Sequence, residues 1–247
     1  FYKIYYEHRV KKSSIFLKIY IFITLPLNYL LNKFFFDTKR NLDLLAKKNI
    51  SFFKKDFKFL FEYFNSDKAE KYLNQYQKST KREKKLLDGH KYHEYYEKYF
   101  SDMKNDKLDI LEIGTFKGNA TAAFYFYFKN ANITTVDIFP DLIRYKSNRI
   151  KNFFLDNSQE EQLEQKILLQ NLGFDLIVED AGHYYKDQII SLFILFRCLK
   201  KKGVFVVEEL DFPDTRLDMN PYKKKPTLRD ILKSIKSNKN FNSELIT

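Results

Sequence analysis

Short apolar runs alternate with helical patterns from Asp109 onward, and this alternation limits the fold more than any other feature of the sequence. The runs predict strands at 109–114, 133–138, 151–156, 174–180 and 203–209. The helical patterns between them cover 119–129, 141–147, 159–170 and 187–200. Apolar strands that alternate with helices are typical of a parallel sheet covered on both faces. We therefore expect an α/β fold with a doubly wound, mostly parallel sheet, and a ligand at the carboxyl ends of its strands.

The first predicted strand leads into a glycine turn, in the stretch Asp109–Gly118 that reads DILEIGTFKG. The strand stops at Gly114, and Gly118 precedes the next helix. Glycine lets a backbone approach a ligand closely, and the helix N-terminus beyond it offers unpaired N–H groups. Asp137 ends the second strand, 23 residues after Gly114, about where nucleotide-binding folds place a ribose-binding carboxylate.

Acidic side chains follow every predicted strand. They are Glu112, Asp137, Asp156, the pair Glu179 and Asp180 with His183 nearby, and the pair Glu208 and Glu209. Carboxylates gathered at one edge of a sheet repel one another unless a ligand or cation uses them. The sequence therefore predicts a binding site at this edge.

The spacing of the glycines indicates the class of ligand. A dinucleotide fold would need a glycine at position 116, which is Phe116 here. The pattern Glu-x-Gly-x-x-x-Gly resembles motif I of the class I S-adenosylmethionine-dependent methyltransferases, which have a Rossmann-like fold. The resemblance implies that S-adenosylmethionine is the cofactor, and the residues expected to bind it are Glu112, Gly114, Gly118, Asp137 and Asp156.

A narrower resemblance covers roughly 90–210, in HEYYEKYF…LDILEIGTFKGNAT…ITTVDI…FDLIVEDAGHYYKDQ…LKKKGVFVVEEL. These segments are similar to the macrocin and mycinamicin sugar O-methyltransferases. That resemblance implies that Asp180 and Glu209 bind Mg²⁺ or another divalent cation and that His183 is the general base. The chain departs from the group at Glu179 and Glu209, where the group has Asp, and at 181–182. The longer Glu209 can still bind a hard cation through oxygen.

Independent chemistry agrees with these roles. Methylation of a hydroxyl group needs a base near the oxygen, which a histidine supplies near neutral pH, and stabilisation of the developing alkoxide, which a cation supplies. We therefore expect an O-methyltransferase acting on a sugar or glycoside hydroxyl. Two alternatives stay open: a differently reacting relative of the cephalosporin hydroxylase-like proteins, and a membrane-docked cofactor-binding protein without activity.

Length and charge divide the 247 residues into two parts. We expect a helical, basic N-terminal extension at 1–88 and an S-adenosylmethionine-binding methyltransferase domain at 89–247. The net charge is +12, and residues 1–60 hold 13 Lys and Arg against 4 Asp and Glu. Such a bias suggests nucleic acid or an anionic membrane. Because lysine is abundant along the whole chain, no nucleic-acid partner is expected.

The single cysteine, Cys198, allows no internal disulfide, which favours the reducing cytoplasm.

The most hydrophobic segment is 15–36, IFLKIYIFITLPLNYLLNKFFF. Lys18 interrupts it and Pro26 breaks it, so the clean apolar run is far shorter than the roughly 20 residues that a membrane-spanning helix needs. Basic residues flank it on both sides. We expect a peripheral contact with a membrane surface, with a packed accessory helix and a true span as the alternatives.

The remaining segments have simpler patterns. Helices are predicted at 41–64, at 92–100 and at 228–235, and 65–88 is predicted to be a solvated connection. His90 and His93 are interpreted as surface or capping residues. Residues 211–226 are placed to act as a substrate lid. No antiparallel strand pair follows the fifth strand, so either the chain is a fragment or its sheet is short, and the oligomeric state stays open.

Overall fold

The protein is built around one parallel sheet, seen in a computed structural model that describes residues 14–34, 39–75, 85–139, 142–243 and 245. The strands are β4 (Asp109–Ile113), β5 (Asn132–Asp137), β7 (Ile150–Phe154), β8 (Phe174–Glu179) and β9 (Leu199–Val207). Their order in the sheet is β7-β5-β4-β8-β9, and every pairing is parallel. The predicted α/β fold is confirmed. The direction of winding reverses beside β4, at the point where such sheets bind ligands.

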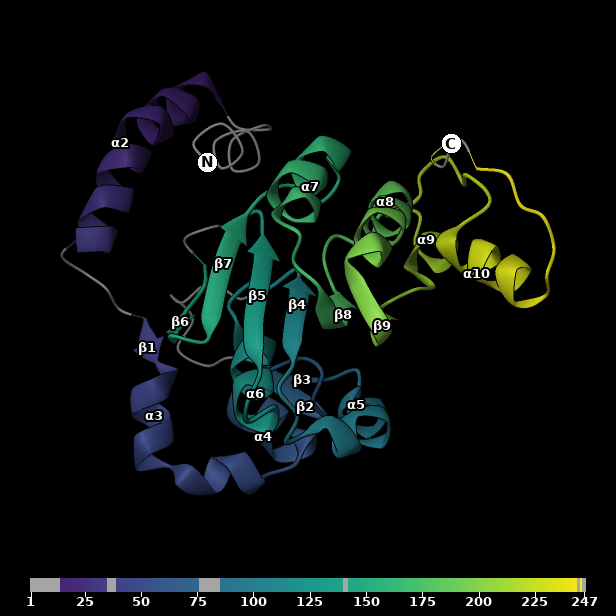
Figure 1. Cartoon of the computed structure of the whole chain (residues 1–247). Coiled ribbons are helices and arrows are strands. Elements are labelled where there is room, and N and C mark those ends of the chain that lie inside the picture. The colour runs from purple at the N-terminus through teal and green to yellow at the C-terminus, as the bar shows by residue number, and fades with distance from the viewer. Residues whose placement is uncertain (1–13, 35–38, 76–84, 140–141, 244, 246–247) are drawn as a thin grey trace.

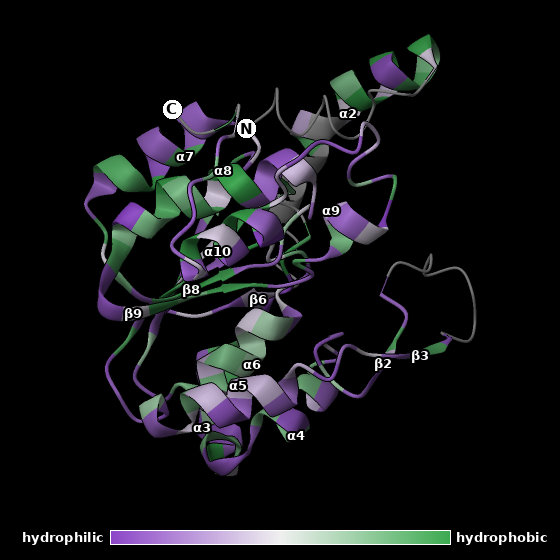
Figure 2. Ribbon diagram, turned by 90° about the vertical axis from the view of Figure 1, so that its right-hand side faces the viewer, coloured by the Kyte–Doolittle hydropathy of each residue, from purple (hydrophilic) through white to green (hydrophobic). Residues whose placement is uncertain are grey.

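Helices cover both faces of the sheet (Figure 2). On one face lies α6 (Asn119–Tyr127), and on the other lie α7 (Glu160–Lys166) and α8 (Tyr185–Leu195). Successive side chains of a strand point to opposite faces. Ile110 of β4 accordingly joins the core under α6, and Leu111 joins the core under α7 and α8. This double burial explains why the central strands β4 and β8 carry apolar side chains toward both faces.

The N-terminal helices complete the layer that contains α6. They are α3 (Leu42–Lys48), a 3₁₀ turn (Ile50–Lys54), α4 (Phe57–Tyr63) and α5 (His93–Phe100). The prediction of helical structure over 41–64 is confirmed, but the segment is divided, because Asn49 ends α3 and the Asp56 carboxylate caps α4 by accepting the Phe59 N–H at 2.8 Å. The Phe57 ring stacks on Tyr127 of α6 with centroids 3.6 Å apart. Residues 42–64 and α6 therefore share one core.

The segment after α4 is not the solvated connection that its polar sequence predicts. Ser66, Lys68 and Ala69 are buried, and β2 (Lys71–Leu73) pairs with β3 (Leu86–Asp88) as an antiparallel hairpin. Backbone bonds tie 67–70 to 89–91, which leaves little room for solvent. Most of the lysine-rich run that suggested a solvated connection falls in 76–84, outside the described residues.

The predicted helix at 141–147 is also wrong within the described residues 142–147. The chain there forms β6 (Tyr145–Lys146), which pairs in parallel with β1 (Arg40–Asn41). The carboxylate of Asp43 stabilises this extended turn by accepting the Ser147 hydroxyl at 2.7 Å and the Asn148 N–H at 2.9 Å. These bonds to a distant part of the chain replace those that a helix would supply.

Helix α2 (Ile15–Phe34) contains the hydrophobic segment as far as Phe34 and stands apart from the sheet (Figure 1), and residues 35–36 of that segment lie outside the described residues. Several of its apolar side chains are exposed, among them Phe16 at 82% and Ile23 at 66%. Among the described helices, none has the length and apolarity that crossing a bilayer demands.

Two helices follow β9. They are α9 (Phe212–Thr215) and α10 (Leu228–Lys236), and α10 packs against α8. Thr227 and Asp230 cap α10 reciprocally. As expected, no antiparallel strand pair follows β9 in the described part of the chain.

Candidate active site

One pocket of about 960 Å³ opens at the carboxyl ends of the strands. Seven of the eight predicted site residues line it, namely Glu112, Gly114, Asp137, Asp156, Asp180, His183 and Glu209. The exception is Gly118, which lies at the N-cap of α6 in a left-handed conformation (φ +77°). A pocket of this size suits a drug-sized or cofactor-sized ligand.

The turn after β4 depends on Gly114. Its φ of +88° lies in the region that favours glycine. A Cβ added there would lie 1.9 Å from the Asp180 carbonyl oxygen, so any side chain would push apart the ends of β4 and β8. Gly114 therefore brings the predicted cofactor loop against the strand that carries Asp180.

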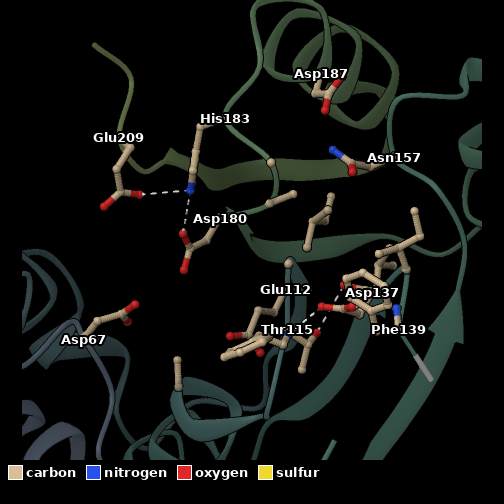
Figure 3. Close-up of a pocket in the computed structure, with 18 of the residues that line it drawn as sticks. Asp67, Glu112, Thr115, Asp137, Phe139, Asn157, Asp180, His183, Asp187 and Glu209 are labelled. Atoms are coloured by element: carbon tan, nitrogen blue, oxygen red, sulfur yellow. Dashed lines mark hydrogen bonds and ion pairs between the residues drawn. The ribbon is translucent and has the colours of Figure 1, made fainter. Parts of the chain in front are cut away.

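Asp137 lies in the part of the pocket that is next to the loop after β4 (Figure 3). One carboxylate oxygen accepts the Phe116 N–H at 2.5 Å, and the other accepts the Phe139 N–H at 2.7 Å. Beside it, Glu112 is buried and accepts a hydrogen bond from the Thr121 hydroxyl. Burial raises the pKa of Glu112 to about 8.

Asp156 and Asp187 line the wall beyond Asp137. Asp156 comes two residues after β7, and its carboxylate accepts the Ser158 N–H at 3.0 Å. Asp187 lies in the first turn of α8. Burial, and secondarily the negative charge of Asp156, raises the pKa of Asp187 to about 6.

Asp180, His183 and Glu209 converge in the other half of the pocket, as predicted (Figure 3). The His183 Nε2 atom lies 3.5 Å from Asp180 Oδ1 and 3.6 Å from Glu209 Oε2. One potential ligand atom from each residue lies within 4.8 Å of the others. Burial lowers the pKa of His183, whereas burial and the charge of Asp180 raise the pKa of Glu209 to about 8.

Three pocket residues adopt backbone conformations that residues other than glycine rarely take. The φ angles are +48° at Phe116, +55° at His183 and +47° at Glu209. Such conformations cost on the order of 1–3 kcal/mol each and concentrate at functional sites. Two of the three residues belong to the converging group, so the fold accepts strain at the positions that aim these side chains.

Lys68 is a charged group at this site that the sequence did not indicate. Its ammonium, in a side chain only 1% exposed, donates to both Asp180 Oδ2 and Glu208 Oε2. Although burial alone would lower it, the facing carboxylates raise the pKa of Lys68 well above its usual range. Tyr96 of α5 donates its hydroxyl to Glu208 Oε1 at 2.5 Å.

The segment around Lys68 also supplies pocket-lining residues. Asp67 faces the Asp180 group across the pocket (Figure 3), and His90 Nδ1 lies 3.5 Å from Glu209 Oε1. His93 is buried, so the interpretation as a surface or capping residue was wrong for His93, whereas His90 is exposed as expected. The one signal available in the sequence was that His90 lies shortly before the aromatic helix α5, which begins at His93.

The converging group fits a divalent cation. It offers the carboxylates of Asp180 and Glu209, whose oxygens are ligands that Mg²⁺ and Mn²⁺ accept. The Oε2 atom of Glu209 is buried and accepts no hydrogen bond from the described residues. An acceptor of that kind is expected where a cation binds.

Comparison with known families agrees with this geometry. A family model described as a methyltransferase domain matches residues 104–246, well over half of the chain. The chain belongs to the methyltransferase-domain family. In this domain, the matched region includes all five strands of the sheet and every predicted site residue.

Two kinds of relative resemble the domain. The 8-demethyl-8-alpha-L-rhamnosyl tetracenomycin-C 2'-O-methyltransferase of Streptomyces olivaceus is 26% identical over 129 residues, which cover 49% of this chain and 33% of that protein. Among solved structures, the MycE methyltransferase of the mycinamycin biosynthetic pathway, in complex with Mg and SAH, is similar. Two crystal forms give TM-scores of 0.58 and 0.60 at 21% and 19% identity, over 74% and 78% of this chain.

The chain spans about half the length of the MycE structures, 48% in both crystal forms. At these identities the structural likeness concerns the fold. It extends over more of the chain than the family model does, so the N-terminal layer takes part in it.

Proposed function

We propose that this protein is an S-adenosylmethionine-dependent O-methyltransferase, assisted by a divalent cation, that acts on a sugar or glycoside hydroxyl. The proposal rests on one observation above all: the loop after β4 and the Asp180–His183–Glu209 group line the same pocket. A methyl donor and an acceptor must meet in one space, and this pocket supplies it.

The cofactor half is the part formed by Gly114, Asp137 and the N-terminus of α6. Asp137 is placed to accept hydrogen bonds from the ribose hydroxyls, and Glu112 and Asp156 flank it. Asp180 and His183 would then lie beside the bound cofactor, because the end of β4 lies directly against the end of β8.

The acceptor half has a cation-binding group and a base. Asp180 and Glu209 would hold Mg²⁺ or a similar ion, which supplies charge stabilisation to a developing alkoxide. His183 has a lowered pKa and is therefore neutral at pH 7, the form that accepts a proton. His183 takes the proton of the acceptor hydroxyl as its oxygen bonds to the methyl carbon. The carbon–sulfur bond breaks, and S-adenosylhomocysteine leaves.

The predicted lid contributes to the acceptor half. Phe212, Arg216 and Met219 line the pocket, and the Phe212 ring lies edge-on to His183 with centroids 5.4 Å apart. A sugar presents apolar C–H faces and many hydroxyls. An aromatic ring beside polar groups is a suitable surface for such a ligand.

The test is incubation with isotopically labelled S-adenosylmethionine, a panel of glycosides, and Mg²⁺ or Mn²⁺. Mass spectrometry should find one labelled methyl group on a sugar oxygen. Cofactor binding without methylation of any panel member would favour the non-catalytic alternative. Labelling on nitrogen or carbon would contradict the assignment of an O-methyltransferase.

We further propose that α2 rests on an anionic membrane surface. Its exposed apolar side chains, including Ile15, Phe16 and Leu27, are carried by a basic region of the sequence, a combination that favours anionic lipid. Flotation should occur with anionic vesicles, weaken with salt, and fail with neutral ones. Equal behaviour with both vesicle types would contradict this, and self-association that buries α2 would assign the helix to a second copy of the chain.

A further inference from the structure

Lys68 is the most deeply buried basic residue beside the pocket. Its side chain is 1% exposed, and its ammonium contacts Asp180 and Glu208, which are more than a hundred positions away in the sequence. Lys68 is not among the residues that line the pocket. It therefore acts on a bound molecule only through its carboxylate partners.

The backbone fixes Lys68 in this position. Its N–H donates to the Ser66 hydroxyl at 3.3 Å, and its carbonyl accepts the His93 N–H at 3.2 Å. Next to it, Gly89 packs so closely that an added Cβ would lie 2.1 Å from the Ala69 carbonyl oxygen. The ammonium is thus delivered by a rigid turn.

The two carboxylates that Lys68 contacts are used differently. Both carboxylate oxygens of Glu208 accept hydrogen bonds, Oε2 from the Lys68 ammonium and Oε1 from the Tyr96 hydroxyl. In Asp180, Oδ2 accepts a hydrogen bond from the Lys68 ammonium, whereas Oδ1 faces His183. The ammonium therefore removes Glu208 from the set of available ligands and leaves Asp180 one oxygen for the pocket.

We propose that Lys68 is a positioning residue that serves as a built-in cation. Its ammonium occupies the place between Asp180 and Glu208 where a divalent ion would otherwise bind, and it confines metal binding to the pocket-side carboxylates of Asp180 and Glu209, which leaves His183 to act as the base. This inference rests on the proposed function only for that second, pocket-side site. The ammonium also lowers the affinity of that site, because a positive charge so near repels a divalent ion.

The test is Mn²⁺ binding, followed by electron paramagnetic resonance and calorimetry, to the whole chain and to Lys68→Met. The variant should bind Mn²⁺ at least about tenfold more tightly than the parent, or bind one more ion, since it gains two unpaired carboxylate oxygens and loses a repelling charge. Mn²⁺ should also raise the thermal unfolding midpoint of the variant more than that of the parent.

Lys200→Met is the matched control. Lys200 also joins two carboxylates, Asp109 at 2.7 Å and Asp175 at 2.8 Å, but these lie at the opposite end of the sheet. Its loss should leave Mn²⁺ binding unchanged. Equal Mn²⁺ binding by the parent and Lys68→Met would overturn the inference. A parent that binds no Mn²⁺ beside a variant that does would instead overturn the pocket-side metal site and leave the role of Lys68 standing.

A second variant covers the case in which Lys68→Met folds poorly. In chelator, Lys68→Met/Glu208→Gln should unfold at a higher temperature than Lys68→Met, because it removes one of the two buried charges left without a partner. A double variant that is no more stable than the single one would contradict a charge-balancing role for Lys68.

Discussion

At the scale of single residues, the site is a set of acids whose environments differ. Asp137 accepts hydrogen bonds from two backbone N–H groups, Glu112 accepts one from a hydroxyl group, and Asp180 accepts one from the Lys68 ammonium. These partners give neighbouring carboxyl groups different hydrogen-bonding environments. The sequence predicted which acids gather at the strand ends but could not predict these partners, since Thr121 and Lys68 carry no distinguishing pattern.

Asp137 tests the cofactor half. Asp137→Ala should weaken the binding of S-adenosylmethionine by about 1–3 kcal/mol, which is the loss of charge-assisted hydrogen bonds to the ribose. Calorimetry measures this directly. Asp109→Asn, at the other end of the same sheet, is the control and should bind like the parent. An Asp137→Ala protein with parental affinity would refute the ribose assignment.

Glu112 gives a prediction about pH. Its pKa is raised to about 8 in the folded protein, whereas in the unfolded chain it is near 4.5. Between these values the folded state holds a proton that the unfolded state has lost, so the contribution of Glu112 to stability falls as pH rises from about 4.5 to 8. Glu112→Gln removes this dependence. The stability of the variant relative to the parent should therefore increase over that range in denaturant unfolding, and parallel curves for the two proteins would contradict the shift.

At the scale of elements, α4 and α6 form one aromatic layer under the sheet. Phe57 is fully buried and stacks on Tyr127, and Glu97 accepts both the Phe57 N–H and the Tyr127 hydroxyl at 3.0 Å. This layer supports the segment that delivers Asp67 and Lys68 to the pocket. The N-terminal helices thus contribute to the site as well as to the core.

Phe57→Ala tests this layer. It should destabilise the protein by about 3–5 kcal/mol, the usual cost of deleting a buried phenylalanine. Tyr95→Ala, on the same face of the molecule but 59% exposed, should change stability by no more than about 0.5 kcal/mol. Denaturant titration measures both. A small effect at Phe57 would show that α4 is not an integral part of the fold.

Prediction from sequence succeeded for elements whose pattern is local and failed where distant contacts decide. The five strands carry continuous apolar runs, so β4, β5 and β8 were located to within a residue or two. The extended turn at 142–147 depends on Arg40 and Asp43, and the burial of 66–69 depends on a hairpin and on carboxylates beyond residue 170. The sequence pattern within these short segments cannot predict contacts with residues so far away in the chain.

At the scale of the whole molecule, two layers meet at one pocket. The sheet brings the cofactor loop beside the end of β8, and the N-terminal layer adds the buried lysine behind Asp180. The family model covers residues 104–246, and Lys68 lies outside that region. The proposed catalytic centre is therefore built by both parts of the chain.

The measurement that tests the central claim most directly is methyl transfer by His183→Ala, compared with the parent in the presence of Mg²⁺ and in chelator. The account predicts that the variant loses roughly 100-fold to 10,000-fold in turnover while its dissociation constant for S-adenosylmethionine stays nearly unchanged. It also predicts that chelator abolishes turnover by the parent and that added Mg²⁺ or Mn²⁺ restores it. A chelator-insensitive parent with an inactive His183→Ala variant would remove the metal and keep the base. Turnover unaffected by either change would contradict the account and place the active site elsewhere.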